Sequence, residues 1–313
     1  MDFVGKKRWF FLFSALLIGA SIVSLLVPPS LVIGIDFKGG TSLSGAFPAN
    51  VTQEELREVL SEFGHGDASI QAAGEGRFFI RTRTLAAAVS DEPSEREVLQ
   101  RGLEEKLGGL EALEFSEVSS VFAQDTVRNA IIAVLAAAVG ILLYITWAFR
   151  RVSNPFRYGL SAIIALAHDV FIVVGSFSIL GKVIGAEVNT MFLTALLAVI
   201  GYSVNDTIVV FDRIRENVLR GVARDMDTVI NLSLSETLGR SLNTSITLAL
   251  TLLAILFMGG TTLRDFILVF LVGVVAGTYS SIGVASQILG AWEKGDLGRG
   301  LRWLRNPLKM SSK

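Results

Sequence analysis

The amino-acid sequence predicts an α-helical membrane protein with six spanning helices and one small α+β domain outside the bilayer. Of the 313 residues, 51% are hydrophobic and only 18% are charged, which is too apolar for an ordinary soluble domain. Charged residues gather between apolar runs of about 20 residues, the length that crosses a hydrocarbon core of about 30 Å. One hydrophilic segment, residues 28–126, has helix and strand patterns of its own.

Six apolar runs predict the six membrane helices. The first run follows three basic residues, Lys6, Lys7 and Arg8, as a signal peptide also would. We interpret it as an uncleaved anchor, because its apolar stretch is long and no cleavage site with small residues follows. The predicted helices cover residues 9–27, 127–149, 158–180, 190–211, 238–258 and 265–292.

Lysine and arginine residues predict the orientation, because cytoplasmic loops are enriched in them. Arginines fill the loop between the second and third helices and the loop between the fourth and fifth, and residues 293–313 form a basic tail. The short loops on the opposite side hold only Lys182 and Arg264. We therefore expect residues 1–27 to be a cytoplasmic tail with the first helix, and both termini to be cytoplasmic. Residues 28–126 would lie outside, and residues 127–292 would form the rest of the bundle.

The outside segment reads as a ferredoxin-like βαββαβ domain. Its first helix has Thr52 at the N-cap and Glu55 at the capping-box position, and a Gly-Glu-Gly turn at residues 74–76 joins two strands. The segment holds 17 acidic and 8 basic residues, which we interpret as a solvated surface. We expect strands at residues 41–47, 68–73, 77–84 and 113–121, and helices within residues 50–64 and 93–108.

Composition argues against several classes of site. The chain has no cysteine, so disulfides, thiolate metal ligands and cysteine nucleophiles are excluded. Its two histidines, His65 and His168, lie in separate regions, which argues against a histidine zinc site. A net charge of −1 gives no basic footprint for nucleic acid, so we expect no nucleic-acid partner. The sequence has no recognisable catalytic motif and no nucleotide-binding loop, so we expect the chain not to be an enzyme and any ATP use to belong to a partner.

Two ionisable residues at membrane depth are the leading functional candidates, because each costs a few kcal/mol or more to place there. Asp206 lies in the inner third of the fourth helix beside Asn205, and Arg240 begins the fifth helix at a similar depth. We predict that Asp206 and Arg240 face each other, so that a proton on Asp206 would release Arg240 and change helix packing. Contact of Asp206 with cytoplasmic water, snorkelling of Arg240 and a purely structural salt bridge stay open. A polar stripe continues from Arg240 at helical spacing: Asn243, Thr244, Thr247 and Thr251.

Near the midpoint of the third helix lie His168 and Asp169. Neighbours on a helix point about 100° apart, so both cannot face one partner. A packing role and a proton-carrying role are both open for this pair, and Asn205, Asn243 and Thr247 are further candidates for a polar path. In the sixth helix, Gly273 and Gly277 have the GxxxG spacing that permits close helix packing.

Four stretches resemble the SecD/SecF family of Sec translocase subunits, and the SecF branch in particular. They are "IGIDFKGGT" (33–41), "ALAHDV" (165–170), "GYSVNDTIVVFDRIREN" (201–217) and "ETLGRSLNTS" (236–245). Their order, the six helices and the single outside domain extend the resemblance over almost the whole chain. Residues 84–95 are the least typical part.

The resemblance implies half of a transporter of the RND superfamily, paired with SecD in a bacterial cytoplasmic membrane. It implies that the pair associates with the SecYEG channel and uses the proton motive force to complete export of preproteins on the outer side. Asp206 and Arg240 match the family residues thought to serve proton transport. The resemblance implies no cofactor besides the driving ion, H⁺, with Na⁺ as the alternative. A second half is expected from a partner, since this chain holds no second copy of its own helices.

Three other functions stay open. An RND-type exporter half for lipids or small molecules would have the same membrane physics, although the small outside domain shows no obvious apolar cleft. A subunit that only scaffolds its partners would tolerate Asp206→Asn, whereas a proton carrier would not. An intramembrane aspartyl protease would need Asp169 and Asp206 to converge, and neither lies in a recognisable catalytic motif.

Overall fold

The chain forms two compact units in the computed structural model. The helical unit comprises residues 1–31, 133–186 and the chain from 191 onward, and the sheet unit comprises residues 32–132 and 187–190. Residues 74 and 75 of the predicted turn, residues 87 and 89–92 of the atypical stretch, and residues 295–313 of the basic tail lie outside the described residues. The structure describes residues 1–48, 51–72, 76–86, 88, 93–108, 111–258 and 263–294, with the backbone alone at 111–113.

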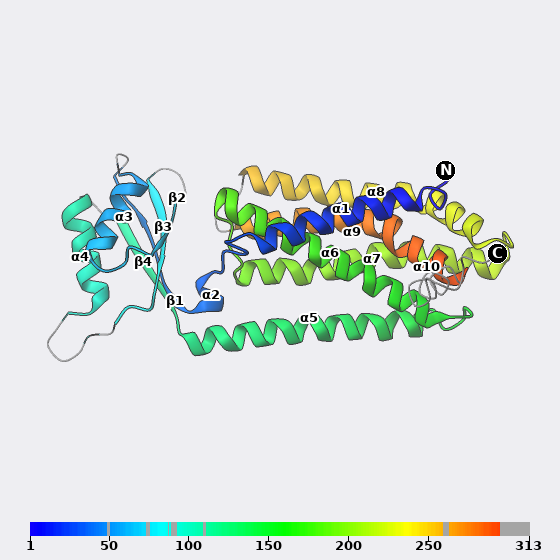
Figure 1. The fold of residues 1–313 in the computed structure, drawn as a ribbon, viewed down its shortest axis with the longest axis horizontal. Coiled ribbons are helices and arrows are strands. Elements are labelled where there is room, and N and C mark those ends of the chain that lie inside the picture. The colour runs from blue at the N-terminus through cyan, green and yellow to red at the C-terminus, as the bar shows by residue number, and fades with distance from the viewer. Residues whose placement is uncertain are drawn as a thin grey trace, which may run out of the picture. The chain divides into compact units, whose positions relative to one another are not determined.

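Six long apolar helices confirm the predicted spans within the described part of the chain. Those of the helical unit run alongside one another (Figure 1). The last span is one continuous rod of three segments, in which a π-helix, η2 (Ser281–Ala285), separates two α-helices. The spans are α1 (Lys7–Leu26), α5 (Ser120–Ala148), α6 (Pro155–Ile184), α7 (Thr190–Arg220), α8 (Met226–Met258) and α9 (Arg264–Ser280) with α10 (Ser286–Glu293).

Each span is longer than its predicted range, and α7 and α8 are extended most. Helix α7 continues past Phe211 to Arg220, and α8 begins at Met226 instead of Leu238. The extensions are amphipathic, and their apolar residues Ile214 and Ile230 are fully buried. Tertiary burial therefore continues the helices beyond the point where uniform hydrophobicity ends.

Helices α6, α7 and α9–α10 form the interior of the helical unit. Half or more of the most apolar stretch of each helix is buried, against 6% for α5. Small residues allow close packing: a Cβ added at Gly273 would lie 2.1 Å from a methyl of Val199, and one at Gly175 would lie 2.1 Å from Cβ of Ser21. The GxxxG interpretation is thus confirmed for α9, which packs through Gly273 against α7. Helix α1 packs through Ser21 against Gly175 of α6.

The sheet unit confirms the predicted βαββαβ order. Its antiparallel sheet has the strand order β2-β3-β1-β4, the ferredoxin-like arrangement. Capping boxes at Thr52 and Ser94 begin the two main helices. The elements are α2 (Ile35–Lys38), β1 (Gly40–Ala46), α3 (Gln53–Glu62), β2 (Ser69–Ala72), β3 (Arg77–Thr82), α4 (Glu95–Leu107) and β4 (Glu111–Val118).

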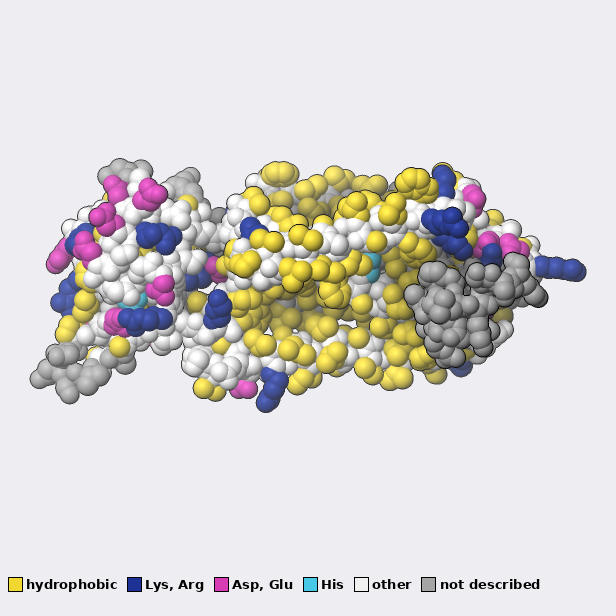
Figure 2. Space-filling model, in the orientation of Figure 1, with side chains coloured by type: hydrophobic (Ala, Val, Ile, Leu, Met, Phe, Trp, Pro, Cys, Tyr) yellow, Lys and Arg dark blue, Asp and Glu magenta, His cyan; other side chains and the backbone are white. Residues whose placement is uncertain are grey.

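The two units have different surfaces. Hydrophobic side chains cover much of the helical unit, while charged side chains of both signs cover the sheet unit (Figure 2). The core of the sheet unit lies between the sheet and its helices, with Leu43, Leu60, Ile80 and Leu103 fully buried. The apolar surface of the helical unit suits lipid, and the polar surface of the sheet unit suits water.

Candidate functional site: buried carboxylates on α6 and α7

Asp206 lies on α7 in the interior of the helical unit, 5% exposed. Its Oδ1 accepts a hydrogen bond of 2.6 Å from the Ser241 hydroxyl of α8. Its Oδ2 is buried and has no hydrogen-bond partner among the described residues. One turn earlier, the Tyr202 hydroxyl lies 3.0 Å from Ser245 Oγ, which also joins α7 to α8. A buried carboxylate oxygen without a hydrogen-bond partner is unfavourable in an apolar site. Binding of a proton, a water molecule or a cation would remove that cost.

The predicted contact between Asp206 and Arg240 is not formed. Arg240 is exposed on α8, and no ion pair joins it to Asp206 in the described structure. The reason is helix geometry, because successive residues point about 100° apart. Ser241 occupies the direction that faces Asp206, so Arg240 is turned to the outer surface of α8. The roles of both residues in proton coupling stay predictions.

The polar stripe of α8 also lies on that outer surface. Asn243 and Thr247 are exposed, and so is Asn205 on α7. The Thr247 hydroxyl donates to the Asn243 carbonyl at 2.7 Å, which satisfies it within the helix. Arg240, Asn205 and Asn243 have side chains that lipid cannot satisfy, so this face needs a polar partner.

Asp169 is the second buried carboxylate, with no exposed surface. Its Oδ2 accepts hydrogen bonds from Ser203 of α7 at 2.6 Å and from Ser280 of α9 at 2.7 Å. Its Oδ1 lies 3.0 Å from His168 Nδ1, so the two neighbouring side chains contact each other, while the hydroxyl groups of Ser203 and Ser280 reach Asp169 alone. Flexible side chains close the 100° between them. Asp169 thus joins three helices and has a donor at both oxygens, unlike Asp206.

Asp169 and Asp206 do not form an aspartyl dyad. Each carboxylate has its own serine donors, and no hydrogen bond connects the two in the part of the chain that the structure describes. An aspartic dyad needs two carboxyl groups about 3 Å apart that share a proton. The geometry therefore gives no support to the protease alternative.

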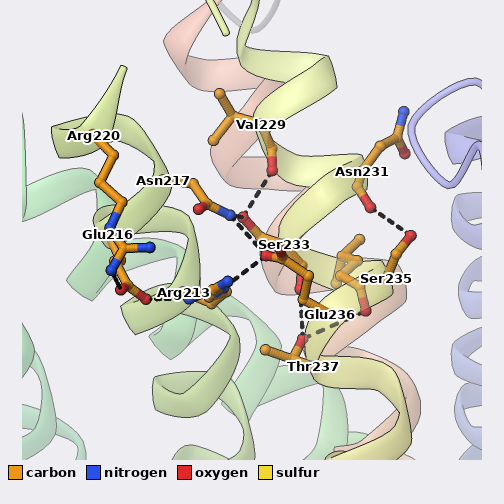
Figure 3. A network of polar contacts seen from close by, with 11 residues as sticks. Arg213, Glu216, Asn217, Arg220, Val229, Asn231, Ser233, Ser235, Glu236 and Thr237 are labelled. Carbon is orange, nitrogen blue, oxygen red and sulfur yellow. Dashed lines mark hydrogen bonds and ion pairs between the residues drawn. The ribbon is translucent and has the colours of Figure 1, made fainter. Parts of the chain in front are cut away.

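A second polar network joins α7 and α8 nearer the turn between the two helices (Figure 3). Arg213 pairs with Glu236 at 2.6 Å and with Glu216. Asn217 is 2% exposed, and its amide donates to Ser233 Oγ at 2.9 Å and to Glu236 at 3.0 Å. This network joins the extended ends of α7 and α8, which form a helical hairpin.

Sequence reasoning missed the serines that position both carboxylates. Ser203, Ser241 and Ser280 lie on three different helices, and small polar residues are common in membrane helices. Ser241 lies directly after Arg240 in "ETLGRSLNTS", and Ser203 lies one turn before Asp206. The helical spacing from Asp206 was the available signal, although it could not say which neighbour each hydroxyl reaches.

The described residues hold no cluster of three or more histidine or acidic side chains suited to a metal ion. Six apolar spans, two buried carboxylates with hydroxyl partners and exposed polar side chains at membrane depth are typical of a multi-pass membrane transport protein.

Comparisons with known proteins identify the family. The model of the protein export membrane proteins SecD/SecF, C-terminal part, matches residues 100–295. The protein translocase subunit SecF of Thermobaculum terrenum is 43% identical over 305 residues, covering 96% of both chains. The protein translocase subunit SecDF of Bacillus subtilis is 32% identical over 299 residues, covering 95% of this chain and 38% of that protein.

A solved structure agrees with these sequence matches. The crystal structure of SecDF, a translocon-associated membrane protein from Thermus thermophilus, superposes with a TM-score of 0.80 at 36% identity. The match covers 94% of this chain and 39% of that one, so this chain spans about two fifths of SecDF. The chain belongs to the SecD/SecF family, as the sequence motifs predicted, and is a multi-pass membrane protein of Sec-pathway protein export.

Proposed function

We propose that this chain forms, with SecD, a complex that uses the proton motive force to assist completion of preprotein export through SecYEG, and that Asp206 is its proton-coupling group. The observation that carries the proposal is the bare Oδ2 of Asp206, buried at membrane depth beside a single serine donor. Such a carboxylate can gain and lose a proton with a large change in its local interactions. Asp169 has donors at both oxygens and suits a fixed structural role better.

The outward polar face supports the SecD partner. Three polar side chains are exposed on α7 and α8, where lipid cannot supply hydrogen-bond partners: Arg240, Asn205 and Asn243. Gly201 and Gly239 lie on the same two helices, and a Cβ added at either would meet nothing within 4 Å, which leaves room for a helix from outside the chain. The relatives named SecDF carry additional chain beyond the part that this protein matches. A second half supplied by SecD would cover the face, and Arg240 would then lie at the interface between the halves.

The energy available suits a mechanical role. One proton crossing a potential of 100 mV releases about 2.3 kcal/mol. A few protons per cycle could therefore bias a conformational equilibrium many-fold, since each 1.4 kcal/mol changes an equilibrium constant tenfold. Because the α7–α8 hairpin is tied at Glu236, a change at Asp206 would be transmitted to both helices together. The bacterial inner membrane, with both termini in the cytoplasm, is the location that the arginine-rich loops support.

The test is Asp206→Asn in proteoliposomes that hold this chain, SecD and SecYEG, with export followed with and without a proton gradient. We expect the variant to assemble normally and to lose only the gradient-dependent part of export. Ser235→Ala is the matched control, because the Ser235 hydroxyl donates only to a carbonyl of its own helix. Native behaviour of Asp206→Asn would refute proton coupling and favour the scaffold alternative.

Replacing the proton gradient with a sodium gradient decides the ion. The oxygen atoms of Asp206 and Ser241 are possible ligands for Na⁺ as well, so the two ions are distinguished by the gradient and not by the residues present. Export driven by the sodium gradient alone, and lost in Asp206→Asn, would assign Na⁺.

A further inference from the structure

The loop between α6 and α7 folds as part of the sheet unit, which the sequence did not predict. Residues 187–190 belong to that unit, and Val188 forms a parallel β-bridge with Ile33. Two backbone hydrogen bonds make the bridge: Gly34 N to Val188 O at 2.9 Å and Val188 N to Val32 O at 2.8 Å. The short stretch that follows α1 is thereby paired with the short stretch that precedes α7.

An ion pair reinforces this bridge. Arg81 of β3 donates to the Glu187 carboxylate at 2.5 Å, and the Glu187 side chain is only 4% exposed. The Arg81 side chain is 20% exposed. Removing one partner of a largely buried pair leaves an uncompensated buried charge, so replacing either residue should disturb this contact strongly. It links a strand of the sheet unit to the loop next to the first residue of α7.

The first residue of α7 is held directly. The Asp36 carboxylate accepts a hydrogen bond of 2.8 Å from the backbone N–H of Thr190. A helix N-terminus has unpaired N–H groups and a partial positive charge, so a carboxylate stabilises it. Gly34 permits the approach, because a Cβ there would lie 3.1 Å from Cβ of Asn189 and 3.3 Å from Val188 O. Both Gly34 and Asp36 belong to "IGIDFKGGT", a stretch to which the proposed function gives no role.

We propose that Asp36, Arg81 and Glu187 are positioning residues that hold Thr190, the first residue of α7 and of the helix that carries Asp206, within the sheet unit. The proposal rests on the proposed function. Because Thr190 belongs to the sheet unit and also begins α7, a displacement of α7 during the export cycle would be passed along the helix to the sheet unit. The attachment therefore stays closed throughout the export cycle, and its loss uncouples the gradient from export while the complex still assembles.

The test uses the full chain with SecD and SecYEG in proteoliposomes, and compares Arg81→Gln and Glu187→Gln with Arg83→Gln. Arg83 directly follows β3 and pairs with Glu95 inside the sheet unit, so it is the matched control. We expect Arg81→Gln and Glu187→Gln to lose gradient-dependent export, and gradient-independent export, assembly and the control to be unchanged. Full gradient-dependent export in both variants would overturn the proposal.

A disulfide in place of the ion pair tests whether the variants lose export because the attachment is lost or because the protein misfolds. The chain has no cysteine, so Ile33→Cys with Val188→Cys gives one defined disulfide between directly opposed residues. Placed in Glu187→Gln, the oxidised pair should restore gradient-dependent export and the reduced pair should not. In the otherwise native chain, oxidation should leave export unchanged, and a reversible loss on oxidation would overturn the proposal because the junction would then have to open.

Asp206→Asn measured in parallel distinguishes a failure of the proposed function from a failure of the attachment proposal. If Asp206→Asn keeps gradient-dependent export, the proposed function fails. If Asp206→Asn loses it while Arg81→Gln and Glu187→Gln retain it, only the attachment proposal fails.

Discussion

Gly273 of α9 packs closely against Val199 of α7, the helix that also carries Asp206. Val199 Cγ2 and Cγ1 lie 2.1 and 2.5 Å from the place where a Cβ would be added at Gly273, whereas an ordinary contact is at least 3.4 Å. Val199 is β-branched, so in a helix it has one strongly preferred rotamer and cannot turn away. Gly273→Ala must therefore separate the two helices or distort them.

Overpacking of this kind costs about 1–3 kcal/mol, and two close methyl contacts place Gly273→Ala in the upper part of that range. Alanine also gains up to about 1 kcal/mol over glycine in a helix. Gly239→Ala is the control, because its Cβ would meet nothing within 4 Å. We expect Gly239→Ala to stabilise slightly and Gly273→Ala to be less stable than that control by about 2–3 kcal/mol.

The assay is unfolding of the full chain in mixed micelles, with the free energy of unfolding compared across the two variants and the native protein. Val199→Ala removes the methyl groups that the new Cβ would meet, so the double variant should recover most of the loss beyond the cost of Val199→Ala alone. Equal stability of Gly273→Ala and Gly239→Ala would refute the packing argument.

Three further predictions follow from the fold. Thr52→Ala should cost about 1 kcal/mol of stability in the sheet unit, because it removes the capping box of α3, and faster hydrogen exchange in α3 would report it. Phe211→Ala should cost about 3–5 kcal/mol, because this ring is fully buried between α-helices of the helical unit; a loss below 1 kcal/mol in micelle unfolding would contradict the burial. Burial lowers the pKa of His65, so below about pH 6.5 the unfolded chain binds a proton that the folded sheet unit does not. The sheet unit should therefore lose stability as pH falls from 7 to 5, measured by hydrogen exchange in β3, and His65→Gln should remove that part of the dependence.

Residue patterns were enough to predict the spans and the βαββαβ domain. Uniform apolar runs specify membrane helices because lipid leaves the backbone no other partner, and the Thr52–Glu55 capping box is a local signal. The helix ends at Arg220 and Met226 were missed, because these extensions are amphipathic and owe their length to burial of Ile214 and Ile230.

The candidate site was predicted in part. Depth in the membrane singled out Asp206, Asp169 and Arg240, since ionisable groups there are costly. The partners were wrong: Ser241, and not Arg240, contacts Asp206. A one-residue step along α8 turns a side chain by about 100°, and depth alone contains no information on that rotation.

Residue patterns were sufficient to predict a six-span membrane protein of the SecD/SecF family with a ferredoxin-like domain and carboxylates at membrane depth. Hydrophobicity, capping and motif order are properties of short stretches, so they can be recognised without a fold. The folded structure was needed to show which hydroxyls reach Asp169 and Asp206, that Arg240 is exposed, and that Asp36 accepts a hydrogen bond from the first residue of α7. These contacts join residues 34 to 154 positions apart, and they depend on how whole helices rotate and pack against one another.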